Sequence, residues 1–223
     1  FVAASMEEAK QNAPFDAAFF ALKSFDTQPA LKQLAPHLQW LPPVICLQNG
    51  VENESILAAS LGNERIIAGT VTSAVRRRAA GDVILERKRG IGLSSLHPRS
   101  GVFASALKIA GLNAHLYPSP LAMKWSKMLT NLVGNATSAI LDLTPAQVFN
   151  HPGLYSLEIQ QLRETLAVMH SLGITVVNLP GVPVRWFALV VDHFPAGIIR
   201  PILQSVVGRG RGDKMPSFYI DLH

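Results

Sequence analysis

The sequence DAAFFALKSFDTQPALKQLAPHLQWLPPVICLQNG, residues 16–50, decides the fold. Its two apolar runs, 16–22 and 44–47, lack the alternation of a half-exposed strand, and such runs are typical of strands buried on both faces of a sheet. Residues 29–38 between them have the pattern of a helix. A strand, a helix and a strand in this order indicate a parallel sheet with a right-handed crossover.

The alternation of helices and strands continues as far as residue 118. A helix is expected over 54–61, ending at Gly62, and a strand rich in β-branched residues over 65–75. The last elements expected are shorter strands over 82–87 and 92–94, a helix over 105–110 and a strand over 113–117. Residues 1–118 are therefore predicted to form an α/β domain.

Helix signals dominate from residue 119 onward. In the dipeptide Ser119-Pro120, the serine can cap a helix that has proline at its first position, and this helix is expected to run to about residue 141. Thr144-Pro145 repeats the signal, and Pro152 opens a further helix with apolar residues at helical spacing. Residues 119–223 are therefore predicted to form a mostly helical domain.

The composition indicates extensive burial. Charged residues are only 16% of the 223 residues and hydrophobic residues are 48%, so much of the chain must lie in a core or an interface, and a homodimer is expected. No apolar run approaches the roughly 18 residues that a membrane helix needs, and the first residues have no signal-peptide pattern. The chain is predicted to be cytoplasmic, without a membrane partner.

The formal charge of +5 includes two basic clusters, at 76–78 and 87–89. These clusters would suit an anionic ligand. They are more often explained as solvated strand ends, here joined by a turn at Gly81-Asp82, and no nucleic-acid motif accompanies them, so no nucleic-acid partner is predicted. Cys46 is the only cysteine and is expected in the core, and the seven histidines have no metal-ligand spacing. A metal site is not predicted.

Polar residues follow both buried runs of the opening stretch. Ligands of open parallel sheets bind beyond the carboxyl ends of the strands, where Lys23 follows the first run and Asn49 the second. The amide of Asn49 can donate and accept hydrogen bonds, and Gly50 lets a backbone come close to a ligand. A Gln-Asn-Gly tripeptide is more often an ordinary turn, but the joint position of these residues favours a ligand-binding edge.

Lys127, Asn131 and Asn135 recur at intervals of four on the expected long helix, so their side chains share one stripe. Apolar residues surround the stripe, which indicates a polar seam in a packed environment rather than a solvated face. Lys124 is an alternative candidate to Lys127 for the functional lysine. The two lie only about 60° apart on the helical wheel, so spacing alone does not choose between them.

Together these motifs resemble the ketopantoate reductase family. The runs 21–24, 47–50 and 124–131 with Asn135 follow in the family's order and spacing, and 213–221 is similar to its substrate-side segment. The resemblance implies NADPH-dependent reduction of 2-dehydropantoate to pantoate, a step of pantothenate and coenzyme A biosynthesis. It also implies a truncated Rossmann-like NADP-binding domain over 1–118 and, over 119–223, a helical substrate and dimerisation domain of the 6-phosphogluconate dehydrogenase C-terminal type.

The resemblance implies one catalytic residue and two sets of binding residues. Lys127 corresponds to the proton donor. Hydride addition to a keto carbon leaves an alkoxide, and an ammonium group supplies both the proton and charge stabilisation. The implied cofactor contacts are Lys23, Asn49 and the backbone of Val75, and the implied substrate contacts are Asn49, Asn131, Asn135 and Ser217.

The sequence departs from the family's pattern in one main respect. It contains no G-x-G-x-x-G fingerprint, the motif that places the cofactor's pyrophosphate at a helix N-terminus. The chain is therefore interpreted as a fragment or remnant of the family's full chain, incomplete at both ends and weakly active or inactive alone. Two other interpretations stay open: a reductase for another 2-keto acid, and a non-catalytic helical dimerisation or binding remnant.

Overall fold

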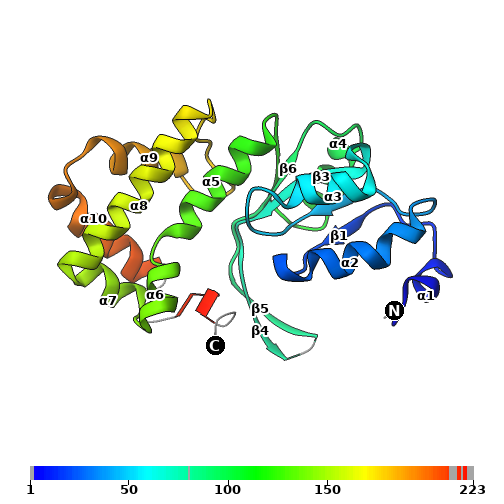
Figure 1. Ribbon diagram of the computed structural model, residues 1–223, viewed down its shortest axis with the longest axis horizontal. Coiled ribbons are helices and arrows are strands. Elements are labelled where there is room, and N and C mark those ends of the chain that lie inside the picture. The colour runs from blue at the N-terminus through cyan, green and yellow to red at the C-terminus, as the bar shows by residue number, and fades with distance from the viewer. Residues whose placement is uncertain (1–2, 80, 211–214, 217, 220–223) are drawn as a thin grey trace. The chain divides into compact units, whose positions relative to one another are not determined.

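The computed structural model describes residues 3–79, 81–210, 215–216 and 218–219 (Figure 1). Its contacts divide the chain into two compact units. Unit 1 is Phe1–Lys124 with Leu179–Val182, and unit 2 is Trp125–Asn178 with Pro183–His223. The division falls within helix α5 (Pro120–Leu132), which begins just after the domain boundary predicted from the sequence.

A five-stranded sheet in the order β1-β2-β3-β6-β7 forms the centre of unit 1 in the described residues. β1 (Ala18–Phe20), β2 (Val44–Cys46) and β3 (Ile66–Val71) are parallel, β6 (Ile91–Ser94) is antiparallel to β3, and β7 (Ala114–Tyr117) is parallel to β6. β6 reverses direction because a hairpin, and no crossover helix, connects it to β3. The predicted α/β class is confirmed, with a mixed rather than purely parallel sheet.

Helices cover both faces of this sheet. Val44 and Cys46 pack in one apolar cluster with residues of α2 and α3, whereas Ile45 packs in another with residues of α4. All three side chains are at most 1% exposed, so the prediction of burial on both faces is confirmed for the run 44–47. The same prediction is wrong for the run 16–22, because β1 is an outer strand of the described sheet and Phe19 and Leu22 are exposed. The helical elements of unit 1 are α1 (Met6–Lys10), η1 (Ser24–Asp26), α2 (Thr27–Leu34), η2 (Ala35–His37), α3 (Asn53–Leu61), η3 (Asn63–Arg65) and α4 (Ser100–Ile109).

The single strand predicted over 65–75 is wrong, because β3 ends at Val71 and a separate hairpin follows. The interruption has a side-chain cause. The buried hydroxyl of Thr72 donates to the Pro180 carbonyl at 2.7 Å, and the Ser73 hydroxyl accepts the amide hydrogens of Arg89 and Gly90 at 3.0 Å. These side chains take up backbone groups that a continuing strand would have paired.

The hairpin consists of β4 (Ala74–Ala79) and β5 (Asp82–Arg87), which form their own two-stranded sheet. Its arginines lie in exposed positions and pair with acids of the same hairpin, Arg76 with Glu86 at 3.1 Å and Arg78 with Asp82 at 3.0 Å. The basic cluster at 76–78 is therefore part of a solvated hairpin.

Unit 2 is built from helices, as predicted. Apolar side chains of α7 to α10 form its core, including Phe149, Ile159, Val190 and Leu203. Both predicted caps are present: the amide of Ala122 donates to Ser119 Oγ, and Thr144 forms a capping box at the start of α7. Besides α5, the helices are α6 (Ala136–Leu141), α7 (Pro145–Asn150), α8 (Pro152–Ser171), α9 (Val184–His193) and α10 (Ala196–Gly210).

The long helix predicted over 120–141 is interrupted after Leu132, and the helix resumes as α6. Gly134 in the break has φ +60°, a left-handed conformation that glycine adopts without strain. Its amide donates to the buried carboxylate of Glu158 on α8 at 2.7 Å. A tertiary partner thus satisfies the amide that loses its place in the helix.

No helix within the described ranges is both long and apolar enough to cross a membrane.

We expect Cys46 to be inert in the folded chain. Burial raises the pKa of its thiol to about 12, and the neighbouring Glu54 carboxylate acts in the same direction. Iodoacetamide at pH 8 should leave the folded protein unmodified and label one thiol per chain in urea, as measured by mass spectrometry. Because the unfolded thiol ionises near pH 8.5, stability should also fall as the pH rises from there towards 12. Rapid labelling without denaturant would contradict this prediction.

Candidate functional site

Lys23 and Asn49 lie at adjacent ends of parallel strands in unit 1. β1 and β2 pair in parallel, so the carboxyl ends of both strands lie at the same edge of the sheet. Just beyond them, the side-chain amide of Gln48 donates to the Leu22 carbonyl at 3.0 Å. Lys23 directly follows Leu22 and Asn49 directly follows Gln48, and both are exposed. The structure therefore places two sequence-predicted residues at one edge, in positions where a ligand can reach them.

Gln48 holds this edge together, a role that the sequence did not indicate. The residue is only 4% exposed, and its amide nitrogen also donates to Thr27 Oγ1 at 2.9 Å. Asn49 is fixed through its backbone, because its carbonyl accepts a hydrogen bond from Asn53 Nδ2 at 2.6 Å. Gly50 follows with φ +101°, which favours glycine. The sequence could not indicate that Gln48 is buried, because the tripeptide Gln48-Asn49-Gly50 is also typical of an ordinary exposed turn.

Lys124 is a buried structural lysine. Its side chain is 4% exposed, and its ammonium group lies 2.8 Å from Glu54 Oε1. The same nitrogen donates to the Gln48 carbonyl at 2.5 Å and to the Gly69 carbonyl at 3.3 Å. Three acceptors match the three hydrogens of an ammonium group. Lys127, half-buried on the next turn of α5, is thus the better candidate for chemistry.

Asn131 and Asn135 line one small pocket in unit 2, with a cavity volume of about 210 Å³. Within the described structure, Asn135 Oδ1 is buried and has no hydrogen-bond partner. A buried acceptor left unsatisfied costs free energy that a ligand hydroxyl or amine can recover. The remaining lining residues are Met128, Leu132, Ala136 and Phe218. The pocket therefore suits a small molecule with an apolar part and a hydrogen-bond donor.

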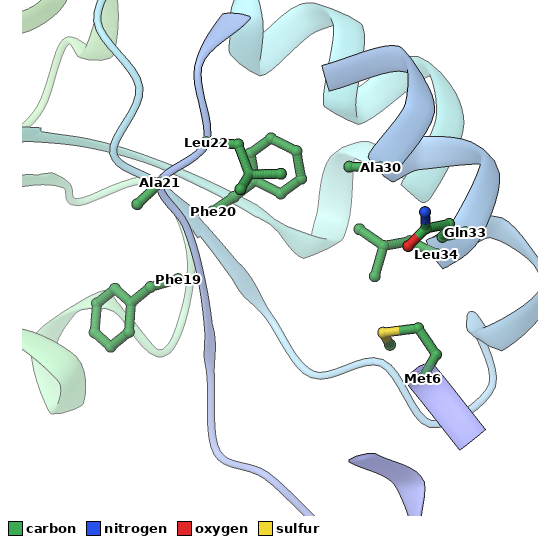
Figure 2. A pocket seen from close by; sticks show the side chains of 8 residues that line it. All are labelled: Met6, Phe19, Phe20, Ala21, Leu22, Ala30, Gln33 and Leu34. Atoms are coloured by element: carbon green, nitrogen blue, oxygen red, sulfur yellow. The ribbon is translucent and has the colours of Figure 1, made fainter. Parts of the chain in front are cut away.

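A second hollow, of about 320 Å³, lies beside β1 in unit 1. Figure 2 shows Phe20 and Leu22 on the side of the strand that faces α2, and Phe19 on the other side. Met6 of α1 closes the lower part of the view, and Gln33 supplies the only polar side chain of the lining. This hollow offers apolar contact but no charged group to orient a substrate.

The structure does not gather all the predicted site residues. Val75 is on the β4–β5 hairpin with its side chain 55% exposed, and it lines neither hollow. A register shift between Ala74 and Val75 interrupts the hairpin ladder there, and such irregularities leave backbone groups unpaired. Ser217 lies outside the described residues. In the part of the chain that the structure covers, no group of three metal-ligating side chains occurs.

Two family models match the chain. The model described as ketopantoate reductase PanE/ApbA matches residues 2–97, and its C-terminal counterpart matches residues 121–222. The chain belongs to the ketopantoate reductase family. Among curated relatives, the 2-dehydropantoate 2-reductase of Halobacterium salinarum is 28% identical over 170 residues, which are 72% of this chain and 54% of that protein. The enzyme of the same name from Pyrococcus horikoshii is 28% identical over 166 residues, covering 71% and 53%. This family member thus spans about half the length of the curated relatives it matches.

Solved structures of this fold come from more than one kind of dehydrogenase. A PanE/ApbA family ketopantoate reductase from Ralstonia eutropha has a TM-score of 0.72 and 21% identity, with 92% of this chain and 62% of that one covered. D-mandelate dehydrogenase with NADH has a TM-score of 0.70 and 19% identity, with 93% and 65% covered. Because both identities are below 25%, these similarities establish only the fold of this chain.

We expect Lys124→Ala to destabilise the chain much more than Lys127→Ala. Removing Lys124 leaves the Glu54 carboxylate without its ion-pair partner in a largely buried place, a change that typically costs about 3–5 kcal/mol. Lys127→Ala should cost about 1 kcal/mol or less, typical of a partly exposed position. Urea unfolding followed by tryptophan fluorescence measures both.

The double variant Lys124→Met with Glu54→Leu provides the control. It removes both charges together, so it should recover most of the lost stability if the ion pair is the cause. Equal losses for the two lysine variants would show that Lys124 is not the anchor of this helix turn.

Proposed function

We propose that this chain contributes the catalytic lysine and most substrate contacts of an NADPH-dependent reduction of 2-dehydropantoate to pantoate. The observation that carries the proposal is the pocket of Asn131 and Asn135, with its unpartnered Asn135 Oδ1, on the helical segment of Lys127 in a ketopantoate reductase family member. Because the chain spans about half of its curated relatives, the complete activity is part of the proposal.

Lys127 is proposed as the general acid. It lies one helical turn before Asn131 on α5 and is half-buried, so its ammonium group is partly shielded from water. When bound, NADPH supplies the hydride that reduces the keto carbon. The carbonyl oxygen then takes a proton from the Lys127 ammonium group: an O–H bond forms, an N–H bond breaks, and the lysine is left as a neutral amine.

The two asparagines are proposed to orient the substrate. The buried Oδ1 of Asn135 can accept the hydrogen of a substrate hydroxyl, and the amide groups can donate to a carboxylate. Neutral amides do this without adding a charge that would compete with the Lys127 ammonium group for the developing alkoxide. The apolar lining beside them suits the aliphatic part of a branched keto acid.

The edge of unit 1 fits one part of a dinucleotide. Lys23 offers an exposed ammonium group, Asn49 an exposed amide, and Gly50 a backbone with no side chain in the way. These groups suit a phosphate and a ribose, and the backbone of Val75 is proposed as a further contact. The glycine fingerprint that binds pyrophosphate is not in this sequence, so this chain supplies only part of the NADPH contacts.

A second candidate is the reduction of another 2-keto acid. It is favoured by the shared fold with D-mandelate dehydrogenase, and by the apolar lining of the Asn131–Asn135 pocket, which sets no strict limit on the shape of the substrate side chain. Comparing binding of pantoate and D-mandelate to the chain separates the two candidates. The better-bound hydroxy acid identifies the substrate class.

A homodimer is also part of the proposed function. A structural relative is a dimeric ketopantoate reductase from Staphylococcus aureus, with a TM-score of 0.65 and 19% identity. Several large apolar side chains of unit 2 are exposed on α6, α9 and α10. A single exposed apolar residue needs no explanation, but several of them favour a protein interface. These side chains are Ile140, Leu141, Trp186, Leu189, Ile198 and Ile202.

The chain alone should bind NADPH only in the millimolar range or more weakly. Each charge-assisted phosphate contact that is missing removes about 1.5–3 kcal/mol, and the pyrophosphate anchor is not in this sequence. Isothermal titration calorimetry tests this directly. Micromolar binding would mean that other residues of this chain hold the pyrophosphate.

Lys127→Ala should lower turnover by about 10²- to 10⁴-fold, the usual contribution of a general acid. The assay uses a chimera in which the family's glycine-fingerprint segment precedes residue 1, with 2-dehydropantoate and NADPH. Asn131→Ala and Asn135→Ala should mainly raise KM, if these amides bind the ground state and the transition state alike. The exposed Lys108→Ala is the matched control and should keep the parent rate. Wild-type kinetics in Lys127→Ala would remove it from the mechanism.

A further inference from the structure

Glu158 is a carboxylate buried without access to solvent. It belongs to α8, is 0% exposed, and faces the break between α5 and α6. One carboxylate oxygen accepts a hydrogen bond from the Gly134 amide at 2.7 Å, and the other accepts one from the Thr137 hydroxyl at 2.5 Å. Both donors are neutral. A buried carboxylate is costly unless such bonds offset its desolvation, so its place at this break calls for a specific role.

Asn135 is the last residue of the break, directly before α6. This residue occupies the N-cap position of α6, where an asparagine side chain usually accepts a hydrogen bond from an amide of the first turn. Here the Asn135 side chain makes no capping hydrogen bond. Glu158 instead bonds the residues on either side of it, Gly134 before and Thr137 after. The side-chain amide of Asn135 therefore does not cap α6.

The same face of α8 also makes a hydrogen bond to the end of α5, before the break. Gln161, one turn after Glu158, donates from Nε2 to the Leu132 carbonyl at 3.4 Å, at the end of α5. Glu158 thus accepts from an amide within the break and from a hydroxyl after it, and Gln161 donates to a carbonyl before it. Gly134 with φ +60° allows the chain to turn between these two contacts. The backbone that carries Asn135 is fixed from α8.

We propose that Glu158 is a positioning residue, which holds the 133–137 backbone so that the Asn135 amide faces the pocket instead of capping α6. The proposal rests on the substrate-binding role proposed for that pocket. Its support is that Asn135 Oδ1 is both unpartnered and buried, and that Asn135 lines the pocket together with Asn131. Glu158 is not among the residues that line the pocket, so it acts through Asn135.

The test is Glu158→Gln in the chain as it stands, with pantoate as the ligand and ¹⁵N NMR as the readout. Glutamine has the same shape, but its neutral amide oxygen accepts the Gly134 hydrogen more weakly than a carboxylate does, and its amide nitrogen donates to the Thr137 hydroxyl instead of accepting from it. The signals of the Gly134 backbone amide and the Asn135 side-chain amide should shift without ligand. Pantoate affinity should fall about tenfold, as expected when a charge-assisted buried hydrogen bond is replaced by a neutral one. Asp192→Asn, an exposed carboxylate in the same unit, should change neither.

A double variant decides whether Glu158 acts through Asn135. If it does, Glu158→Gln with Asn135→Ala binds pantoate no more weakly than Asn135→Ala alone, because the shared contact is already gone. Additive losses would overturn the proposal. Thr137→Val, which removes only the hydroxyl, should give a smaller loss of the same kind and remains informative if Glu158→Gln does not fold.

The two proposals fail in different ways. If pantoate shifts no signal of the unmodified chain, the substrate role of the pocket is overturned. If pantoate binds but Glu158→Gln leaves the Gly134 and Asn135 signals and the affinity unchanged, the positioning role of Glu158 is overturned and the pocket stands.

Discussion

The fold of unit 1 depends on the buried ammonium group of Lys124. The Gln48 carbonyl, just beyond β2, and the Gly69 carbonyl, within β3, both accept hydrogen bonds from this nitrogen, and the Glu54 carboxylate balances its charge. A single side chain therefore joins two strands and helix α3 to the first turn of α5. Asn49 directly follows Gln48, whose carbonyl this network binds, so one of the residues proposed to contact the cofactor is positioned by a buried ion pair.

Much of this fold could be predicted from the sequence because its signals are local. The apolar run 44–47 is buried on both faces, and the caps at Ser119 and Thr144 lie where their side chains predict them. The end of β3 could not be predicted, because Thr72 is drawn away by the Pro180 carbonyl, more than a hundred residues later in the chain. The sequence shows a continuous β-branched run, whereas the tertiary hydrogen bond divides it.

The candidate site shows the same limit. The intervals of four identify Asn131 and Asn135 as neighbours, and they do line one pocket. The helical wheel does not choose between Lys124 and Lys127, because the deciding facts are burial and the acceptors around each nitrogen. The break before Asn135 could not be predicted either, because the partner of its Gly134 amide, Glu158, belongs to another helix and the burial of Glu158 leaves no mark in the sequence pattern.

The first strand has a consequence for how the protein behaves in solution. In the described residues β1 is at one end of the sheet, with β2 as its only neighbour, and its middle residue, Phe19, is 55% exposed. Open, apolar edges are where chains add to one another to build fibres, which requires segments of about six or seven residues. β1 has three residues. An edge so short offers too few free main-chain groups to template a growing sheet, so the brevity of this strand protects the molecule from polymerisation.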